Sequence, residues 1–175
     1  VHSLSRAIAL CERTLTFGKA EEPPPTLAVV PLAPLVREVV EGESEGVGEK
    51  GIAISLDIPT TLRVRADADQ LFRVLSNLVR NAAQAIEASA KPGTVTVSAR
   101  AAGRQCEISV ADTGPGLPAK ARENLFQPFR GGARQGGSGL GLTIAQNFVL
   151  HHHGTIECES QPGRTVFVVR LPLQA

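Results

Sequence analysis

The chain has 175 residues, a hydrophobic content of 42% and a formal net charge of +1, which suit one domain with a core and an appendage. The small charge excludes bulk attraction to nucleic acid or to a membrane surface, and the sequence shows neither a transmembrane run nor a signal peptide. Cys11, Cys106 and Cys158 lack paired spacing, so we expect reduced thiols and a cytoplasmic location.

The first part of the chain contains two predicted helices and two predicted strands. Residues Val1–Ala20 place apolar side chains three or four positions apart, as on one stripe of an amphipathic helix. The prolines of Glu21–Pro25 end this helix and indicate a stiff linker to a globular body. A second helix is predicted over Leu32–Val47, a half-buried strand over Ile52–Ile58 and a short partner strand over Leu62–Arg65.

The strongest helical pattern runs from Asp67 to Ala88. Six apolar residues form its predicted buried face: Leu71, Val74, Leu75, Leu78, Val79 and Ala82. Asn77 and Asn81 lie one turn apart beside that face. Because asparagine is a poor helix former, two of them here indicate either a functional site or a pair of solvated or backbone-bonded amides.

Four further strands follow from the alternation of apolar and polar residues. They cover Thr94–Arg100, Gln105–Ala111, Thr155–Ser160 and Arg164–Leu171, with Gly103 in the hairpin turn between the first two. Together with the helices, these strands predict an α+β fold. It is a two-layer α/β sandwich whose mixed, mostly antiparallel sheet of about five strands is covered by helices on one face.

Two glycine clusters stand in the central part of the chain. The first is Asp112–Gly116, and the second, Gly136–Gly141, leads directly into a helical stretch over Leu140–Leu150. A glycine-rich turn that opens a helix binds anions, because its N–H groups and the positive end of the helix dipole point the same way. Either cluster alone also fits a flexible loop. No Lys-Ser/Thr pair follows Gly141, which excludes a P-loop, and no strand precedes the second cluster, which excludes a dinucleotide fingerprint.

In this order, the segments resemble the catalytic ATP-binding domain of sensor histidine kinases, within the wider group that includes gyrase, MutL and the heat-shock chaperone ATPases. The resemblance implies the Bergerat ATP-binding fold over roughly Leu32–Leu173. It rests on an N box, a G1 box, an F box, a G2 box and two closing-strand segments: Asn77–Ala82, Asp112–Gly116, Phe126–Phe129, Gly137–Leu142, His153–Ile156 and Gly163–Phe167.

The resemblance assigns a Mg-ATP site to these motifs. It implies that Asn81 supplies an amide oxygen to Mg²⁺, an ion that prefers oxygen ligands, and that Asn77 acts beside it. The carboxylate of Asp112 would accept a hydrogen bond from the adenine amino group. The other ATP-binding residues would leave space for the ring, cradle the phosphates or line the closing strands: Gly114, Gly116, Gly137, Ser138, Gly139, Leu140, Gly141 and Thr165.

The segment between the glycine clusters would act as a lid over the nucleotide. We expect Gly116–Gly137 to be poorly ordered without ATP. Arg130 and Arg134 lie within it, and either can reach the γ-phosphate or remain a solvated charge. We assign the catalytic role to Arg130.

Residues 1–25 resemble the second helix of the kinase dimerisation hairpin with its exit linker, and residues 26–175 resemble the catalytic domain. The family's phosphoacceptor histidine lies on the first hairpin helix, and His2 lacks that motif. We therefore expect a fragment that binds ATP without its own acceptor. The implied partners are the phosphoacceptor helix of the same kinase, a response regulator and a second copy in a homodimeric full-length protein, with no nucleic acid.

Two other functions compete with this interpretation. An anti-sigma-type serine kinase shares the fold but would not need the Val1–Ala20 helix. A non-catalytic adaptor would have lost ATP, which the presence of Asn81, Asp112 and both glycine clusters argues against. We do not expect His151–His153 to bind a metal, because consecutive helical residues point in different directions.

Overall fold

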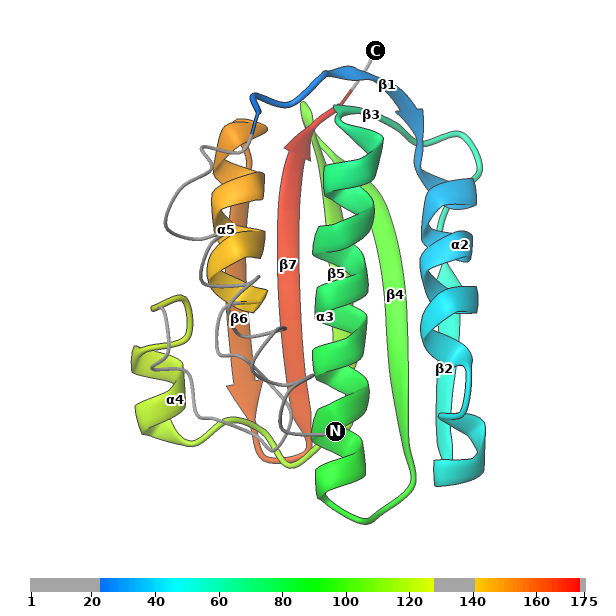
Figure 1. The fold of residues 1–175 in the computed structure, drawn as a ribbon, viewed down its shortest axis with the longest axis vertical. Coiled ribbons are helices and arrows are strands. Elements are labelled where there is room, and N and C mark those ends of the chain that lie inside the picture. Colours follow the sequence, from blue (N-terminus) through cyan, green and yellow to red (C-terminus); the bar gives the residue numbers. More distant parts are fainter. Residues whose placement is uncertain (1–22, 128–140, 174–175) are drawn as a thin grey trace, which may run out of the picture.

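The computed structural model describes residues 23–127 and 141–173. Its central sheet has the strand order β2-β4-β5-β7-β6 (Figure 1). The β2–β4 pair is parallel, whereas β4–β5, β5–β7 and β6–β7 are antiparallel. The strands are β2 (Ile52–Asp57), β4 (Gly93–Ala102), β5 (Gln105–Asp112), β6 (Thr155–Gln161) and β7 (Arg164–Pro172). The predicted mixed, mostly antiparallel sheet is confirmed.

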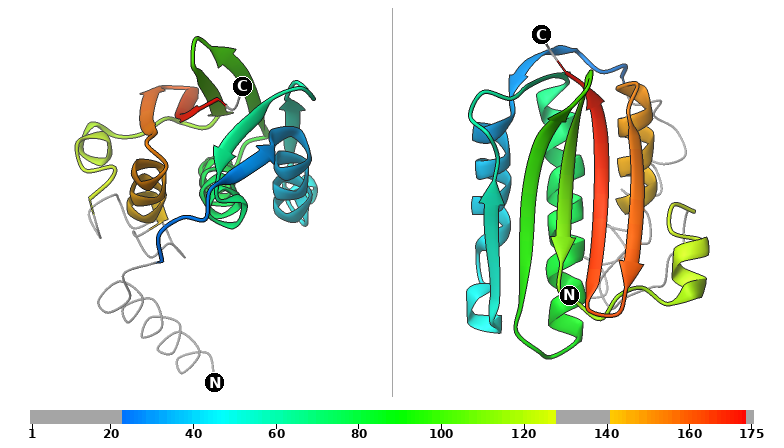
Figure 2. Two further views of the ribbon diagram at one scale, coloured as in Figure 1. Left: turned by 90° about the horizontal axis from the view of Figure 1, so that it is seen from above. Right: turned by 180° about the vertical axis from the view of Figure 1, so that it is seen from behind.

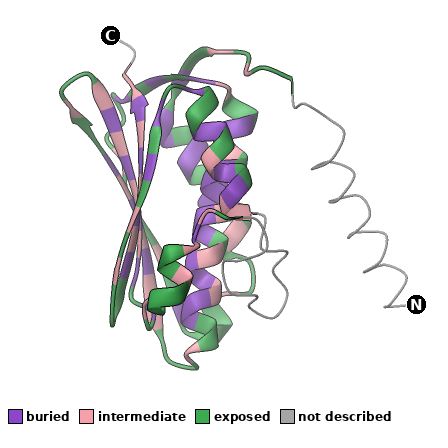
Figure 3. Ribbon diagram, turned by 90° about the vertical axis from the view of Figure 1, so that its left-hand side faces the viewer, coloured by how far each residue is buried: buried purple, intermediate pink, exposed green. Residues whose placement is uncertain are grey.

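Three helices cover one face of this sheet. They are α2 (Leu32–Ser44), α3 (Ala68–Ala88) and α5 (Gly141–His151), with α3 between the other two (Figures 1 and 2). Buried residues gather between the helices and the sheet, as Figure 3 shows. All six apolar residues predicted for the buried face of α3 are at most 4% exposed. The two-layer sandwich with helices on one face is therefore also confirmed.

A separate two-stranded sheet lies beside the entry to α2. It pairs β1 (Ala28–Pro31) with β3 (Arg63–Ala66) in antiparallel register. The sequence predicted β3 but gave it the wrong partner, because β1 was not recognised. The N–H of Leu32 donates to the carbonyl oxygen of Leu62 at 3.1 Å, which ties the start of α2 to the chain entering β3.

Two other short elements were not predicted: the 3-10 helix η1 (Gly48–Lys50) and the helix α4 (Ala119–Glu123). The α4 helix lies within the segment expected to be a lid. Lid residues 128–137 and the predicted helix Val1–Ala20 lie outside the described residues, so the expectations about them stay predictions.

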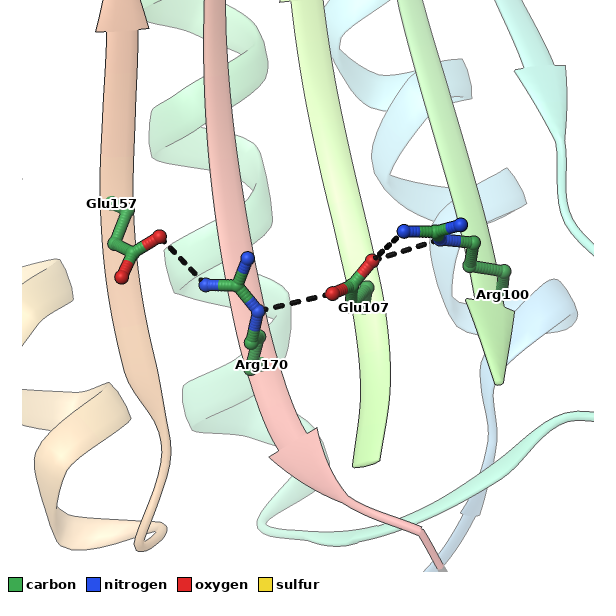
Figure 4. Close-up of polar contacts among 4 residues, drawn as sticks. All are labelled: Arg100, Glu107, Glu157 and Arg170. Atoms are coloured by element: carbon green, nitrogen blue, oxygen red, sulfur yellow. Dashed lines mark hydrogen bonds and ion pairs between the residues drawn. The ribbon is translucent and has the colours of Figure 1, made fainter. Parts of the chain in front are cut away.

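The sheet face turned away from the helices carries a ladder of four charged residues (Figure 4). Arg100 of β4 lies 2.6 Å from Glu107 of β5. Arg170 of β7 contacts Glu107 at 3.1 Å and Glu157 of β6 at 2.8 Å. Hydrogen bonds from Arg100 and Arg170 lower the pKa of Glu107 below its usual value. These pairs cross-link four strands on the side that the helices leave uncovered.

The end of α5 approaches β7 closely. His153 takes a left-handed conformation with φ of 58°, and the N–H of Gly154 donates to the carbonyl oxygen of Val149 at 2.9 Å, which closes the last turn. A Cβ on Gly154 would meet the carbonyl oxygen of Arg170 and the side chain of Leu171. Glycine is therefore required where α5 turns into β6.

Candidate functional site

The helix α3 carries a stripe of three amides beside its buried face. Asn77 and Asn81 are both half-buried. Gln84, three residues after Asn81, shares their side of the helix by spacing and is also half-buried. These three residues, here called the amide stripe, extend over about 10 Å at 1.5 Å per residue. The stripe is long enough to follow a nucleotide rather than a single ion.

The end of β5 places a buried carboxylate beside the C-terminal half of α3. Asp112 is 4% exposed, and its Oδ1 accepts a hydrogen bond from the N–H of Gly114 at 2.9 Å. A Cβ on Gly114 would lie 2.8 Å from Asp112 Oδ1 and 3.4 Å from the Cβ of Ala85 in α3. A side chain at position 114 would therefore press on the Asp112 carboxylate. The structure brings Asp112 and Gly114 together at the Gln84 end of the amide stripe.

A pair of hydroxyls continues from Asp112 across β7 and β6. Thr165 is the register partner of Asp112 and is 4% exposed. Its hydroxyl lies 2.8 Å from that of Ser160, and Ser160 Oγ accepts the N–H of Leu117 at 2.8 Å. The turn after Asp112 is thereby fastened to the strands that carry Thr165 and Ser160.

The second glycine of this turn also has a packing role. Gly116 has φ of 85°, a value that few residues other than glycine adopt. A Cβ there would lie 2.6 Å from the carbonyl oxygen of Gln161. The contact explains why glycine stands at 116, while the expectation that Gly114 and Gly116 make room for adenine stays a prediction.

At the other end of the stripe, α5 begins directly against Asn77. A Cβ on Gly141 would lie 2.5 Å from Asn77 Oδ1 and 2.7 Å from its Nδ2. The Oγ1 of Thr143 donates to the carbonyl oxygen of Phe126 at 2.9 Å, which ties the first turn of α5 to the F box. The structure thus places Asn77 of the predicted N box against Gly141 of the predicted G2 box.

Several predicted site residues lie outside the described part of the chain: Arg130, Arg134, Gly137, Ser138, Gly139 and Leu140. Their contacts with phosphate stay predictions. The described members of the predicted site form two groups beside α3. One group, near the C-terminal half of the helix, is Asp112, Gly114, Gly116 and Thr165. The other group is Asn77 and Asn81 of α3 with Gly141 of α5.

Other chemistry-bearing side chains lie outside the predicted site. His152 is 4% exposed, and its Nε2 accepts the N–H of Asp67 at 2.9 Å. Within residues 23–127 and 141–173, no His, Cys, Asp and Glu side chains gather into a group that could hold a metal ion. Burial raises the pKa of Cys106 and of Cys158 to about 11, so neither thiol is an effective nucleophile at neutral pH.

Comparison with known proteins identifies the family. Residues 66–175 match the family described as "Histidine kinase-, DNA gyrase B-, and HSP90-like ATPase". The chain is 38% identical over 149 residues to sensory histidine kinase/phosphatase NtrB of Vibrio alginolyticus, which covers 79% of this chain and 41% of that protein. Full-length ShkA in complex with AMPPNP has a TM-score of 0.82 and 30% identity, over 99% of this chain and 37% of that one. Histidine kinase ThkA in complex with response regulator TrrA has a TM-score of 0.78 and 27% identity, over 99% and 49%.

The chain therefore belongs to this ATPase family, as a catalytic, ATP-binding domain of the two-component sensor histidine kinase type. It spans about two fifths of the length of the Vibrio relative. Among the described helices, none combines the length and the apolar character that crossing a membrane requires.

Sequence reasoning missed three residues that lie beside the predicted site residues. Gln84 could have been found, because it continues the spacing of Asn77 and Asn81 along one helix face. Thr143 and Ser160 gave no signal. Their hydroxyls bond to the F box and to the turn after Asp112, and these segments are distant in sequence.

We predict that Asp112→Asn weakens ATP binding. The new amide NH₂ would face the adenine amino group, and the loss of a charge-assisted hydrogen bond costs about 1.5–3 kcal/mol. Asp57→Asn is the matched control, since Asp57 is an exposed aspartate at the end of β2. Calorimetric titration of both variants with ATP, after circular dichroism has verified the fold, measures the effect. Unchanged affinity in folded Asp112→Asn would contradict the adenine assignment.

Proposed function

We propose that the chain binds Mg-ATP along α3 and directs its γ-phosphoryl group to a histidine on a hairpin helix outside this chain. One observation carries the proposal: the two glycine contacts lie at opposite ends of one amide stripe. Gly114 packs on Ala85, and Gly141 packs on Asn77. These positions on α3 are about 12 Å apart at 1.5 Å per residue, which suits a nucleotide with its base at Asp112 and its phosphates at Asn77.

The residues at the phosphate end fit a magnesium ion. Amide oxygens are hard ligands that Mg²⁺ accepts together with phosphate oxygens and water, and Asn77 and Asn81 offer two of them on one half-buried helix face. The absence of a side chain at Gly141 lets the Asn77 amide lie directly against the start of α5. Asn81 would hold the ion, with Asn77 beside it, and the bound ion would neutralise phosphate charge.

The chain's own contribution to the reaction is positioning. Phosphoryl transfer depends mainly on orientation and on charge stabilisation, with little covalent chemistry from the protein. Asp112 and Thr165 would fix the base, and Gly141 with Gly137, Ser138, Gly139 and Leu140 would hold the phosphates. Arg130 would add positive charge at the γ-phosphate.

The proposal extends to the protein of which this domain is a part. Residues 1–25 would be the second helix of a dimerisation hairpin and its linker, followed by the catalytic domain at 26–175. The ThkA structure contains a response regulator, which supports a response regulator as the downstream partner. The full-length protein would be a homodimer with this domain in the cytoplasm.

We predict that Asn81→Ala reduces the Mg²⁺-dependent tightening of ATP binding. The helix should persist, because alanine is the better helix former. Asn147→Ala serves as control, since Asn147 is an exposed asparagine of α5. ATP affinity is measured with Mg²⁺ and with EDTA for parent and variants. The same metal dependence in all three proteins would rule out Asn81 as the ligand.

We also predict that the chain alone stays unlabelled by γ-³²P-ATP with Mg²⁺, because no acceptor is held in line with the γ-phosphate. A longer chain that includes the first hairpin helix should acquire acid-labile label on a histidine of that helix. Strong acid-labile labelling of the 175-residue chain, lost on His2→Ala or on substitution of His151 or His153, would contradict the assignment of the acceptor to another segment.

A further inference from the structure

A cluster of hydrogen bonds joins three parts of the chain at the beginning of α3. Asp67 caps the helix, because its Oδ1 accepts the N–H groups of Asp69 and Gln70, each at 3.1 Å. Its Oδ2 accepts the N–H of Thr26 at 2.9 Å. Its own N–H donates to Nε2 of His152 at 2.9 Å. We call Thr26, Asp67, Gln70 and His152 the Asp67 cluster.

The histidine of this cluster bridges the two helices of the nucleotide site. Because its Nε2 accepts a hydrogen bond, the neutral ring carries its proton on Nδ1, which donates to the carbonyl oxygen of Phe148 at 2.6 Å. One neutral imidazole thus connects the start of α3 with the last turn of α5. Burial raises the pKa of Asp67. Hydrogen bonds from the N–H groups of Gln70, Thr26 and Asp69 lower it by more than burial raises it, so the net pKa is below its usual value. The carboxylate is therefore charged at neutral pH.

The two helices are fixed to each other at both ends of their contact. Asp67 meets His152 at one end, and Asn77 meets Gly141 at the other. Along α3, Asp67 and Asn77 are about 15 Å apart. Along α5, Gly141 and His152 are about 16 Å apart. The helices are antiparallel and matched in length over this span. A shift at Asp67–His152 therefore changes the register in which Asn77 meets the start of α5.

The incoming chain contacts the same cluster twice. In Figure 1 the first described residues cross from the end of α5 over the start of α3 toward β1. Thr26 is bound by Asp67, and the Nε2 of Gln70 donates to the carbonyl oxygen of Pro23 at 3.5 Å. Gln70 is 7% exposed, and its Oε1 has no hydrogen-bond partner in the described part of the chain. The Gln70 contact thus adds a second attachment of the incoming chain to the start of α3.

We propose that the Asp67 cluster couples the position of the incoming chain at Pro23–Thr26 to the nucleotide site, with Asp67 and His152 as positioning residues. Docking of Thr26 favours the register of α3 and α5 in which Asn77 contacts Gly141. Release of Thr26 loosens that register. The coupling rests on the proposed nucleotide site and adds to it a route by which the segment before the domain changes ATP binding.

Coupling of this kind is reciprocal. If docking of Thr26 tightens ATP binding by some factor, bound ATP must strengthen the Thr26–Asp67 bond by the same factor. This requirement separates a coupled contact from a merely structural one. A structural contact affects stability without responding to nucleotide.

The test uses two substitutions at one exposed position. Thr26→Pro removes the N–H that Asp67 accepts and extends the existing run of prolines, whereas Thr26→Ala keeps that N–H. With AMP-PNP and Mg²⁺ as the probe, Thr26→Pro should bind roughly fivefold more weakly than the parent, near the lower end of typical coupling factors. Thr26→Ala should match the parent. In the parent, AMP-PNP should slow hydrogen exchange of the Thr26 amide by the same factor.

A double-mutant cycle checks that the effect passes through Asp67. Asp67→Asn should weaken AMP-PNP binding, and adding Thr26→Pro should weaken it no further, because both substitutions break one bond. Two results would overturn the coupling and leave the proposed function intact. One is equal AMP-PNP affinity of Thr26→Pro and Thr26→Ala. The other is a hydrogen-exchange rate of the Thr26 amide that AMP-PNP does not change. Failure of the folded parent to bind AMP-PNP would instead overturn both.

Discussion

The burial of one face of α3 against the sheet fixes the direction of every other side chain on that helix. Leu75, Leu78 and Val79 are fully buried, so α3 cannot turn by one residue, about 100°, without exposing its apolar face. The amide stripe is therefore held at the half-buried border of that face. The contacts at Ala85 and Asn77 then decide which end of the stripe meets the β5 turn and which end meets α5.

In the proposed placement of ATP, the end of the site for the base and the end for the phosphates are held in different ways. At the base end, Asp112 and Thr165 belong to adjacent paired strands, and both are buried. Their separation is set by strand register, which suits recognition of a rigid ring. At the phosphate end, Asn77 faces the first residue of a helix whose far end is held by Asp67 and His152. The phosphate end is thus the part that a displacement of α5 would alter.

The sequence was sufficient for elements whose patterns are local. The buried face of α3, the strand ending at Asp112 and the glycine clusters are visible in consecutive residues, and the structure places them as expected where it describes them. The β1–β3 pairing and the Asp67 cluster could not be predicted in this way. Both depend on backbone N–H groups, which carry no sequence signature. The Asp67 cluster uses the N–H of Thr26 and also needs His152, which lies 85 residues from Asp67.

The central claim is that ATP lies along α3 with its base at Asp112 and its phosphates at Asn77. Amide chemical-shift changes measured by NMR with adenosine and then with Mg-ATP test it most directly. Adenosine should shift the amides of Thr113, Gly114 and Ala85. Mg-ATP should shift these and, in addition, the amides of Asn77 and Gly141. Adenosine shifts centred on Asn77 and Gly141, with none near Gly114, would contradict this placement.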